Sequence, residues 1–576
     1  MDRNLLIAFV LSTLIFVGWM TYQQQVVLPQ RRAVAERATA EAEARGETTA
    51  LAEAAQAPVE PGRALDIVKD THATPPLSPG VPRGDDSDAR PVPEWSGTLE
   101  NEAVLATFSN RGGVITGWQL KGWFESPRQE VPVELVDLPD GVPTTLSTPL
   151  VELGLGDLSN AMYEVEESGE ERIVFALRRD GVVVRKTYEQ LDEQFQIQLA
   201  IEITNQTDRI LSPRFGLVVP GVANDREDWK ELSLIARANS DVTRELVQSL
   251  GTPGFMGGLF GGWEGPITLS AVQWGGIDVR YFAKLVWPVD ADGSGLTMDV
   301  LEPGKVGFVR LEGRPVEISP RASQARRYTA FFGPKQPALL DALGNDLDQA
   351  VSRGYSWVAP LTGFFGWALH RVHDFVPNYG LAIIVLTILV RMATWPIMAR
   401  QMKSAERMRE LMPRIKELQE KYKDDRQKQS EETFKLYRET GVNPLGGCLP
   451  MVLQLPVFIG LFYALQSSID LRHAPFFLWI NDLSAPATLF TLPGLDFPVR
   501  ILPVLMGASM FIQQKMMPQT GMDPAQAKMM LIMMPGMMLV ISYTFPSGLV
   551  LYWMVSNVLG IAHQLYVRSR MQAESS

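Results

Sequence analysis

The sequence lacks most of the groups on which enzymes and metal proteins depend. Its 576 residues include one cysteine, Cys448, which excludes an internal disulfide framework and any cysteine-based zinc site. All five histidines lie outside residues 94–335, so that long stretch has no imidazole for acid–base catalysis. No GxxxxGK[ST] phosphate-binding motif is present, and no activated nucleophile is evident. We therefore expect no enzyme, no cofactor and no bound metal.

Charge is unevenly distributed along the chain. The whole chain has 53 Lys+Arg and 65 Asp+Glu residues, for a net charge of −12. Residues 357–576 hold 20 basic and 15 acidic residues, a net charge of +5, whereas residues 24–356 hold 32 and 49, a net charge of −17. This division excludes a uniformly basic nucleic-acid binder and indicates two parts made for different surroundings.

The N-terminus carries an uncharged run, Leu5–Tyr22, which follows Arg3 and is about as long as a membrane-spanning helix. A cleaved signal peptide is the competing interpretation, but it requires a small-x-small site where this chain reads MTYQQQ. We therefore predict an uncleaved signal anchor over residues 1–22, with the following chain outside the cytoplasm. Residues 23–93, rich in Ala and Glu and then in Pro, Gly and Asp, predict a flexible tether.

Short alternating runs such as FQIQLAIEITN, separated by Gly, Asp, Asn and Pro, fill residues 94–335. This pattern predicts a large antiparallel β-sandwich. A sandwich of this size also suits a sugar-binding or mutarotase-like enzyme. Because no pair of carboxylates is singled out by its spacing, a structural or docking domain is the preferred interpretation.

Residues 336–376 are amphipathic and aromatic, which predicts helices that lie in the membrane interface. His370 and His373 have the spacing of a metal pair, but nothing nearby completes a ligand set.

Five apolar segments then predict a five-helix membrane core over residues 377–576, and the signal anchor brings the total to six spans. The segments are Tyr379–Met398, Cys448–Gln466, Ile501–Ile512, Met529–Phe545 and Leu549–Val567. Residues 399–447 hold 12 basic residues, whereas the loop 467–500 holds two, so we expect both termini in the cytoplasm and the β domain outside it.

Arg391 is the strongest candidate for a functional residue. It follows an uncharged run within the first of the five segments, where an arginine costs about 2.5–3.5 kcal/mol by insertion scales. A snorkelling arginine near the membrane surface is the plain alternative. The functional interpretation is a wet pocket whose fixed positive charge attracts an acidic segment of a guest.

Other polar residues within the apolar segments favour such a pocket over a packed bundle. They are Thr387, Gln454, Gln513, Gln514, Ser542, Thr544, Ser556 and Asn557. The five segments contain no Asp or Glu, which counts against an ion-coupled pump. Eleven of the 24 methionines fall between Met506 and Met538, which suits either an adaptable client surface or lipid-facing filler, with copper binding a more distant alternative.

Residues 399–440 predict a charged helical hairpin that turns at Asp424-Asp425, with Pro413 bending its first arm. Its apolar stripe has a coiled-coil spacing and consists of Met408, Leu411, Ile415, Leu418 and Tyr422. The hairpin is either a solvated charged element or a docking arm for a cytosolic partner.

Three sequence motifs, NPLGGC (ending at Cys448), FPSGL (starting at Phe545) and ILVRMATWP (around Arg391), together resemble the YidC membrane protein insertase family. The resemblance covers essentially the whole chain. It implies an inner-membrane protein whose residues 94–335 form a periplasmic β-super-sandwich and whose hairpin 399–440 is the cytoplasmic region that family members need.

The resemblance also implies roles for single residues. Arg391 becomes the arginine of a hydrophilic client-binding groove, in which we also place Thr387, Gln454, Gln513, Ser556 and Asn557. A hydrophobic slide for a client's transmembrane segment is expected from Leu455, Phe458, Tyr552 and Trp553. Only Arg568 and Arg570 are basic after Val567, so a polybasic, ribosome-attracting tail is missing.

The predicted function is insertion and folding of inner-membrane proteins, alone or with the Sec translocon, without a nucleotide. Expected partners are nascent clients, lipid and the Sec translocon, with a ribosome or signal recognition machinery contacting the hairpin. A small-anion transporter or channel that uses Arg391 for selectivity is the alternative from another class. A third idea gives the β domain its own glycan-binding activity.

Overall fold

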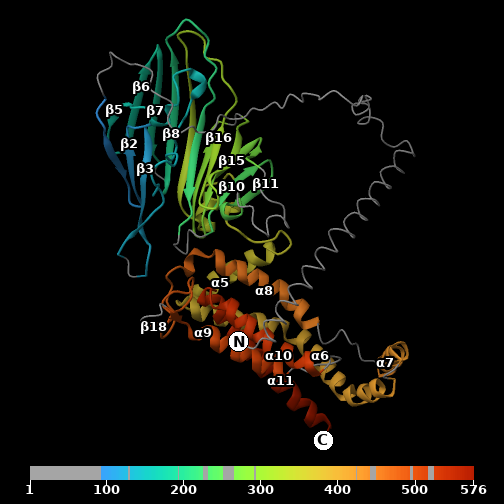
Figure 1. Ribbon diagram of the computed structural model, residues 1–576. Helices are drawn as coiled ribbons and strands as arrows, with labels where there is room; N and C mark the ends of the chain where they lie inside the picture. The colour runs from blue at the N-terminus through green and yellow to red at the C-terminus, as the bar shows by residue number, and fades with distance from the viewer. Residues whose placement is uncertain are drawn as a thin grey trace, which may run out of the picture. The chain divides into compact units, whose positions relative to one another are not determined.

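The computed structural model describes residues 92–575 apart from nine short gaps (Figure 1). The gaps are 128–129, 192–193, 225–230, 251–264, 291–292, 423–424, 441–448, 493–496 and 517–523. The predicted signal anchor, nearly all of the tether and Cys448 lie outside the described residues.

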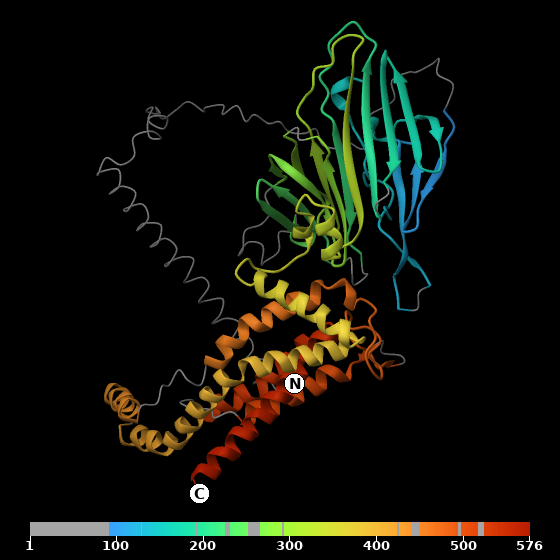
Figure 2. The same ribbon diagram turned by 180° about the vertical axis from the view of Figure 1, so that it is seen from behind.

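A nine-stranded antiparallel sheet dominates the first part of the described chain (Figures 1 and 2). Its spatial order is β11 (Asp241–Leu246), β10 (Ser233–Ala238), β13 (Val272–Asp278), β14 (Phe282–Pro288), β17 (Ser323–Pro334), β8 (Gln196–Asn205), β7 (Val182–Gln190), β6 (Arg172–Arg179), β5 (Glu164–Ser168). In β8 the residues Ile197, Leu199, Ile201 and Ile203 are buried, while Gln198, Ala200 and Glu202, which alternate with them, are partly exposed. This period of two is the alternation that the sequence predicts for a strand with one face on a core.

Two four-stranded antiparallel sheets accompany the large one. The first runs β1 (Ser96–Glu100), β2 (Val104–Ser109), β3 (Val114–Phe124), β4 (Pro132–Glu134), and the second runs β12 (Ile267–Leu269), β15 (Gly295–Glu302), β16 (Val306–Glu312), β9 (Gly216–Val222).

Both small sheets pack on one face of the large sheet. Lys284 of β14 and Phe332 of β17 are register partners, so their side chains lie on the same face. The Lys284 Nζ donates to the backbone carbonyl of Pro220 in β9 at 2.6 Å, and the Phe332 ring lies 5.1 Å from that of Trp118 in β3. The Trp118 indole N–H also donates to the Phe332 carbonyl at 2.8 Å. The predicted antiparallel β-sandwich is therefore confirmed.

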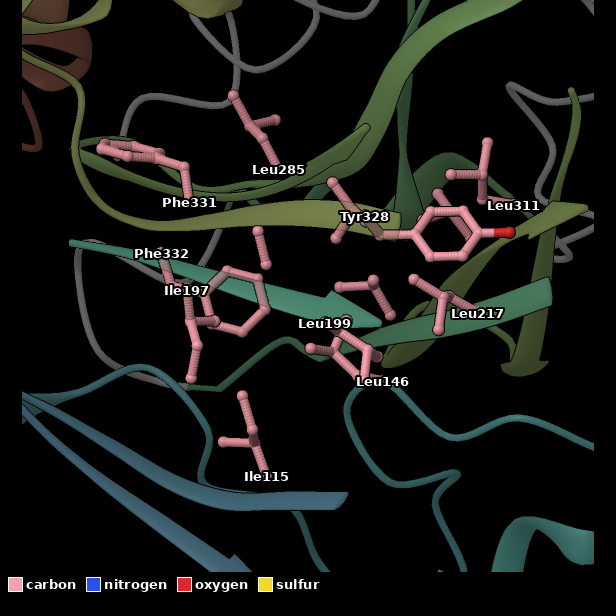
Figure 3. Packing of buried hydrophobic residues seen from close by; sticks show 14 of the residues in the cluster. Ile115, Leu146, Ile197, Leu199, Leu217, Leu285, Leu311, Tyr328, Phe331 and Phe332 are labelled. Atoms are coloured by element: carbon pink, nitrogen blue, oxygen red, sulfur yellow. The ribbon is translucent and has the colours of Figure 1, made fainter. Parts of the chain in front are cut away.

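The core between the sheets is a single apolar cluster that draws on all three. Figure 3 shows Ile197, Leu199 and Phe332 on the side of the sheet that faces Ile115 and Leu146. All five side chains are at most 2% exposed, as expected for close-packed residues between two layers.

Helices make up most of the chain after the sheets. They are α4 (Pro337–Ala342), α5 (Ala359–Phe375), α6 (Tyr379–Lys421), α7 (Arg426–Thr440), α8 (Leu449–Ser467), α9 (Ile501–Met516), α10 (Pro524–Ser542) and α11 (Ser547–Ser575). α11 packs against α6 and α9, α10 packs against α9, and α5 packs against α8 and α6. Leu386, Leu461, Met506 and Leu549 are among the residues of their common apolar core.

Two helices of the described chain are long and apolar enough to cross a membrane, namely Tyr379–Pro396 within α6 and Ser547–Val567 within α11. A shorter apolar stretch, Leu531–Ser542, lies in α10. The structure thus supports a helical membrane part, and the number of six spans stays a prediction.

α6 continues without interruption through Pro396 and Pro413 for 43 residues. Its distal half meets α7, where Ile415, at 1% exposed, packs with Leu411, Met412, Leu436 and Tyr437. The Asp425 carboxylate accepts the backbone N–H of Lys428 at 3.0 Å and so caps the start of α7.

A small hairpin was not anticipated from the sequence. β18 (Phe490–Leu492) pairs with β19 (Phe497–Val499) in the connection between α8 and α9. Its strands are three residues long, too short for the alternating pattern to stand out from the surrounding apolar residues.

Candidate functional site

Arg391 lies on α6, three turns after the helix begins, and reaches across to α11. Its Nε and Nη2 atoms donate to the Ser556 hydroxyl at 3.1 and 2.6 Å, and Nη2 also donates to the Ser556 carbonyl at 2.9 Å. No carboxylate of the described residues lies within ion-pair distance of this guanidinium. The arginine is held in place by neutral oxygens, so its positive charge is oriented but not neutralised.

The neighbouring polar residues are paired with one another. Thr387, one turn before Arg391, is buried and donates to the Ile383 carbonyl at 2.6 Å, which is the usual way a helical threonine satisfies its hydroxyl. The Asn557 amide donates to the Ser509 hydroxyl of α9 at 3.1 Å, and both residues are buried. These bonds tie α11 to α9 beside the arginine.

Gln454 and Tyr552 connect α8 to α11. The Gln454 amide donates to the Tyr552 hydroxyl at 3.2 Å, and Tyr552 is 2% exposed. The structure therefore places Tyr552, which was predicted for the hydrophobic slide, inside the helical core and next to a polar residue.

Gln513 approaches Arg391 through a gap left by a glycine. A Cβ atom on Gly560 of α11 would lie 2.5 Å from the Gln513 amide nitrogen and 3.9 Å from Arg391 Nη2. The absent side chain leaves room for both polar groups beside α11. Arg391, Gln513 and Ser556 are thus brought together from three helices.

The remaining predicted apolar residues lie on α8 and α11. The rings of Phe458 and Trp553 are 4.7 Å apart, and both side chains are partly buried. Leu455 is 53% exposed, one residue after Gln454. An apolar contact between α8 and α11 therefore adjoins the polar pair Gln454–Tyr552.

Sequence reasoning did not single out Trp395 and His563. Their rings are stacked at a centroid distance of 3.7 Å, so they form a second contact between α6 and α11. Trp395 follows Arg391 by four residues, and His563 follows Ser556 by seven, so each repeats a helical face already occupied by a site residue. The presence of an imidazole within the apolar segment Leu549–Val567 could have identified His563 as a candidate site residue.

Other candidates are not assembled into sites. Among the residues that the structure describes, no three His, Cys, Asp or Glu side chains are placed to hold a metal ion. His373 instead stacks on Tyr379, with ring centroids 3.7 Å apart. Met529, Met533 and Met537 share one face of α10 and are 38–46% exposed.

Comparisons with known proteins find one family of inner-membrane proteins. Residues 371–574 match the family model described as the 60Kd inner membrane protein. A membrane protein insertase YidC from Syntrophus aciditrophicus is 33% identical over 488 residues, covering 82% of this chain and 85% of its own length. The protein of the same name from Geobacter metallireducens is also 33% identical over 488 residues, covering 82% and 86%.

Solved structures are more distant. A crystal structure described as an active YidC insertase with its first transmembrane domain resolved covers 82% of this chain and 92% of its own, at 18% identity and a TM-score of 0.34. A galactose mutarotase related enzyme from Lactobacillus acidophilus covers 41% of this chain and 97% of its own, at 13% identity and a TM-score of 0.31.

Proposed function

This chain belongs to the YidC family of membrane protein insertases, and from that premise we propose that Arg391 and the polar residues around it receive the client during insertion. The observation that carries the proposal is a guanidinium in an apolar helix with hydrogen bonds to Ser556 and no carboxylate partner among the described residues. A partly buried cation of this kind attracts a group of opposite charge. The acidic or polar flank of a client segment is such a group.

The free energy for insertion comes from the client itself. Apolar residues contribute about −0.3 to −0.6 kcal/mol each, so a segment of roughly 20 such residues gains about 6–12 kcal/mol on entering lipid. The protein needs only to lower the barrier for the polar flank, which has no place in the hydrocarbon. Arg391, Gln454 and Gln513 provide polar partners at that step, and no nucleotide or covalent chemistry is required.

The apolar path lies beside the polar one in this proposal. The apolar segment of the client moves along Leu455, Phe458 and Trp553 while its flank contacts the arginine. Tyr552 also supports the polar residues in this proposal, because its hydroxyl accepts a hydrogen bond from the Gln454 amide. The contact between Phe458 and Trp553 keeps both aromatic rings next to this path.

The chain is an inner-membrane protein by its family, and its topology is part of the proposal. We place spans at residues 1–22 and at five segments within 377–576, with both termini in the cytoplasm. Residues 23–93 then form a periplasmic tether, 94–335 the periplasmic sandwich and 336–376 interfacial helices. The acidic middle of the chain and the basic residues of 399–447 support this orientation.

The proposed partners follow from the same arrangement. Nascent inner-membrane proteins and the lipid bilayer contact the helical part, and the Sec translocon hands over some of the clients. The hairpin formed by the distal half of α6 and by α7 is the proposed contact for a ribosome or signal recognition machinery. We assign no catalytic reaction to the chain, and no described feature favours the small-anion transporter.

Replacing Arg391 tests this proposal. We expect Arg391→Ala to slow the insertion of a client with an acidic flank more than that of a client with an uncharged flank, and Arg391→Lys to restore much of the loss. The assay is protease protection of short clients in a strain depleted of its own insertase. Arg371→Ala is the matched control, because Arg371 pairs with Asp374 at 3.4 Å on the exposed side of α5. Normal insertion of both clients by Arg391→Ala would refute the role of the charge.

A further inference from the structure

His563 is the one histidine within the five predicted apolar segments, and its surroundings are not those of an ordinary packed residue. The side chain is 6% exposed, and its Nε2 atom has no hydrogen-bond partner among the described residues. A buried polar atom without a partner is costly, and an ionisable residue within a membrane segment usually has a functional role. The position therefore calls for a ligand.

The imidazole lies on the same side of α11 as the arginine contact. Ser556, Gly560 and His563 follow one another at spacings of four and three residues, which places them on one helical face. Trp395 comes one turn after Arg391 on α6 and stacks on His563, with their planes 21° apart. The two helices thus carry two successive contacts, Arg391 with Ser556 and Trp395 with His563.

Gly560 keeps the space between these two contacts open to polar groups. The Gln513 amide lies at the point where a side chain on Gly560 would stand, and Arg391 Nη2 is close by. Hydrogen-bond donors from α6 and α9 therefore lie beside the face of α11 that carries His563. A ligand that accepts hydrogen bonds fits this set better than a ligand that donates them.

We propose that His563 is a second client-binding residue, which donates a hydrogen bond from Nε2 to a carboxylate of the client's flank next to Arg391. This inference rests on the proposed function, because it adds His563 to the client-binding site around Arg391 and gives that site a second contact with acidic clients. Trp395 holds the ring by stacking and so fixes the direction of Nε2. The neutral imidazole is sufficient for this bond, so no protonation step is needed.

Two substitutions separate the hydrogen bond from the stacking. His563→Gln keeps a donor amide near the position of Nε2 and loses the aromatic ring, whereas His563→Phe keeps a ring on Trp395 and loses the donor. The full-length chain is purified and reconstituted in vesicles, and insertion is measured for a single-span client with an aspartate flank and for the same client with alanines there. His370→Phe is the matched control, because it removes an exposed imidazole from α5.

We expect His563→Phe to slow insertion of the acidic client at least fivefold and the alanine client less than twofold, while His563→Gln stays within twofold of the parent chain for both. If His563→Phe inserts the acidic client normally, or if His563→Gln is the more defective variant, the ring acts by packing and the inference is wrong.

Arg391→Ala in the same assay distinguishes this inference from the proposed function. A defect in Arg391→Ala with normal insertion by His563→Phe overturns the role of His563 alone. Normal insertion of the acidic client by both variants overturns the charged site as a whole.

Discussion

Replacing the buried Lys186 of the β-sandwich by methionine should stabilise the domain in mild acid and destabilise it in alkali. The side chain is fully buried, and its Nζ donates to the Gly112 carbonyl at 2.7 Å. Burial in this core lowers the pKa of Lys186 from 10.5 to about 7. Methionine has a similar length and fills the same space without a polar atom.

The sign follows from proton binding. The unfolded chain keeps the Lys186 proton up to about pH 10.5, whereas the folded chain keeps it only up to about pH 7. Between these values the unfolded state binds more protons, so this lysine makes stability rise with pH. Below pH 7 the buried charge lowers the free energy of unfolding by about 5 kcal/mol, which corresponds to the size of the pKa shift. Above pH 10.5 this cost is absent, because the lysine is neutral in both states.

Lys186→Met removes that cost and leaves the Gly112 carbonyl without its donor, which costs about 1–3 kcal/mol. We therefore expect the variant to be more stable than the parent by about 3 kcal/mol at pH 6 and less stable by about 2 kcal/mol at pH 10.5, with a crossing near pH 9. Lys284, also buried, is present in both proteins and cancels in the difference.

The assay is urea unfolding of residues 92–350, which contain nearly all of the sandwich core, followed by tryptophan fluorescence at four pH values. An effect of Lys186→Met with the same sign and size at pH 6 and pH 10 would contradict the lowered pKa of Lys186, because it would show that this lysine carries the same charge in the folded and unfolded chain.

Three further predictions concern packing. Gly276→Ala should destabilise the sandwich by about 3 kcal/mol in the same urea assay, because its Cβ would overlap a backbone carbonyl of the paired strand β14. Gly560→Ala should leave the thermal stability of the full chain nearly unchanged, because the flexible end of the Gln513 side chain can move aside. Equal losses would contradict this contrast. Trp118→Phe should lower the free energy of unfolding by about 1–3 kcal/mol, since it leaves a buried carbonyl without its indole donor, and an unchanged urea midpoint would argue against that bond. Ile415→Ala should separate α7 from the distal half of α6, seen as faster protease cleavage within 399–440 at an unchanged rate elsewhere.

The sandwich was predictable because apolar and polar residues alternate along its strands with a period of two, as in β8, and this alternation can be seen in the sequence. The pairing of Lys284 with a carbonyl of β9 was not predictable, since a lysine in an alternating pattern normally faces solvent. Only the packing of a second sheet over that face reveals the burial.

The site was partly predictable for a similar reason. Arg391 stands out because a charge in an apolar helix is rare, and its neighbour in space, Ser556, was named as a polar residue of the last segment. Tyr552 was predicted only for the slide because an aromatic residue in an apolar run resembles any other apolar residue, and its hydroxyl bond to Gln454 depends on how α8 meets α11. The stacking of His563 on Trp395 likewise depends on the crossing of two helices.

A charge exchange at residue 391 tests whether the fixed positive charge of Arg391 attracts an acidic flank of the client. The insertion rates of Arg391→Glu and of the parent chain are measured with two clients that differ only in an aspartate or a lysine flank. We expect Arg391→Glu to insert the aspartate client more slowly and the lysine client faster than the parent chain does, so that the preference inverts. If Arg391→Glu inserts both clients at the rates of the parent chain, or slows both equally, the charge of Arg391 does not select the client.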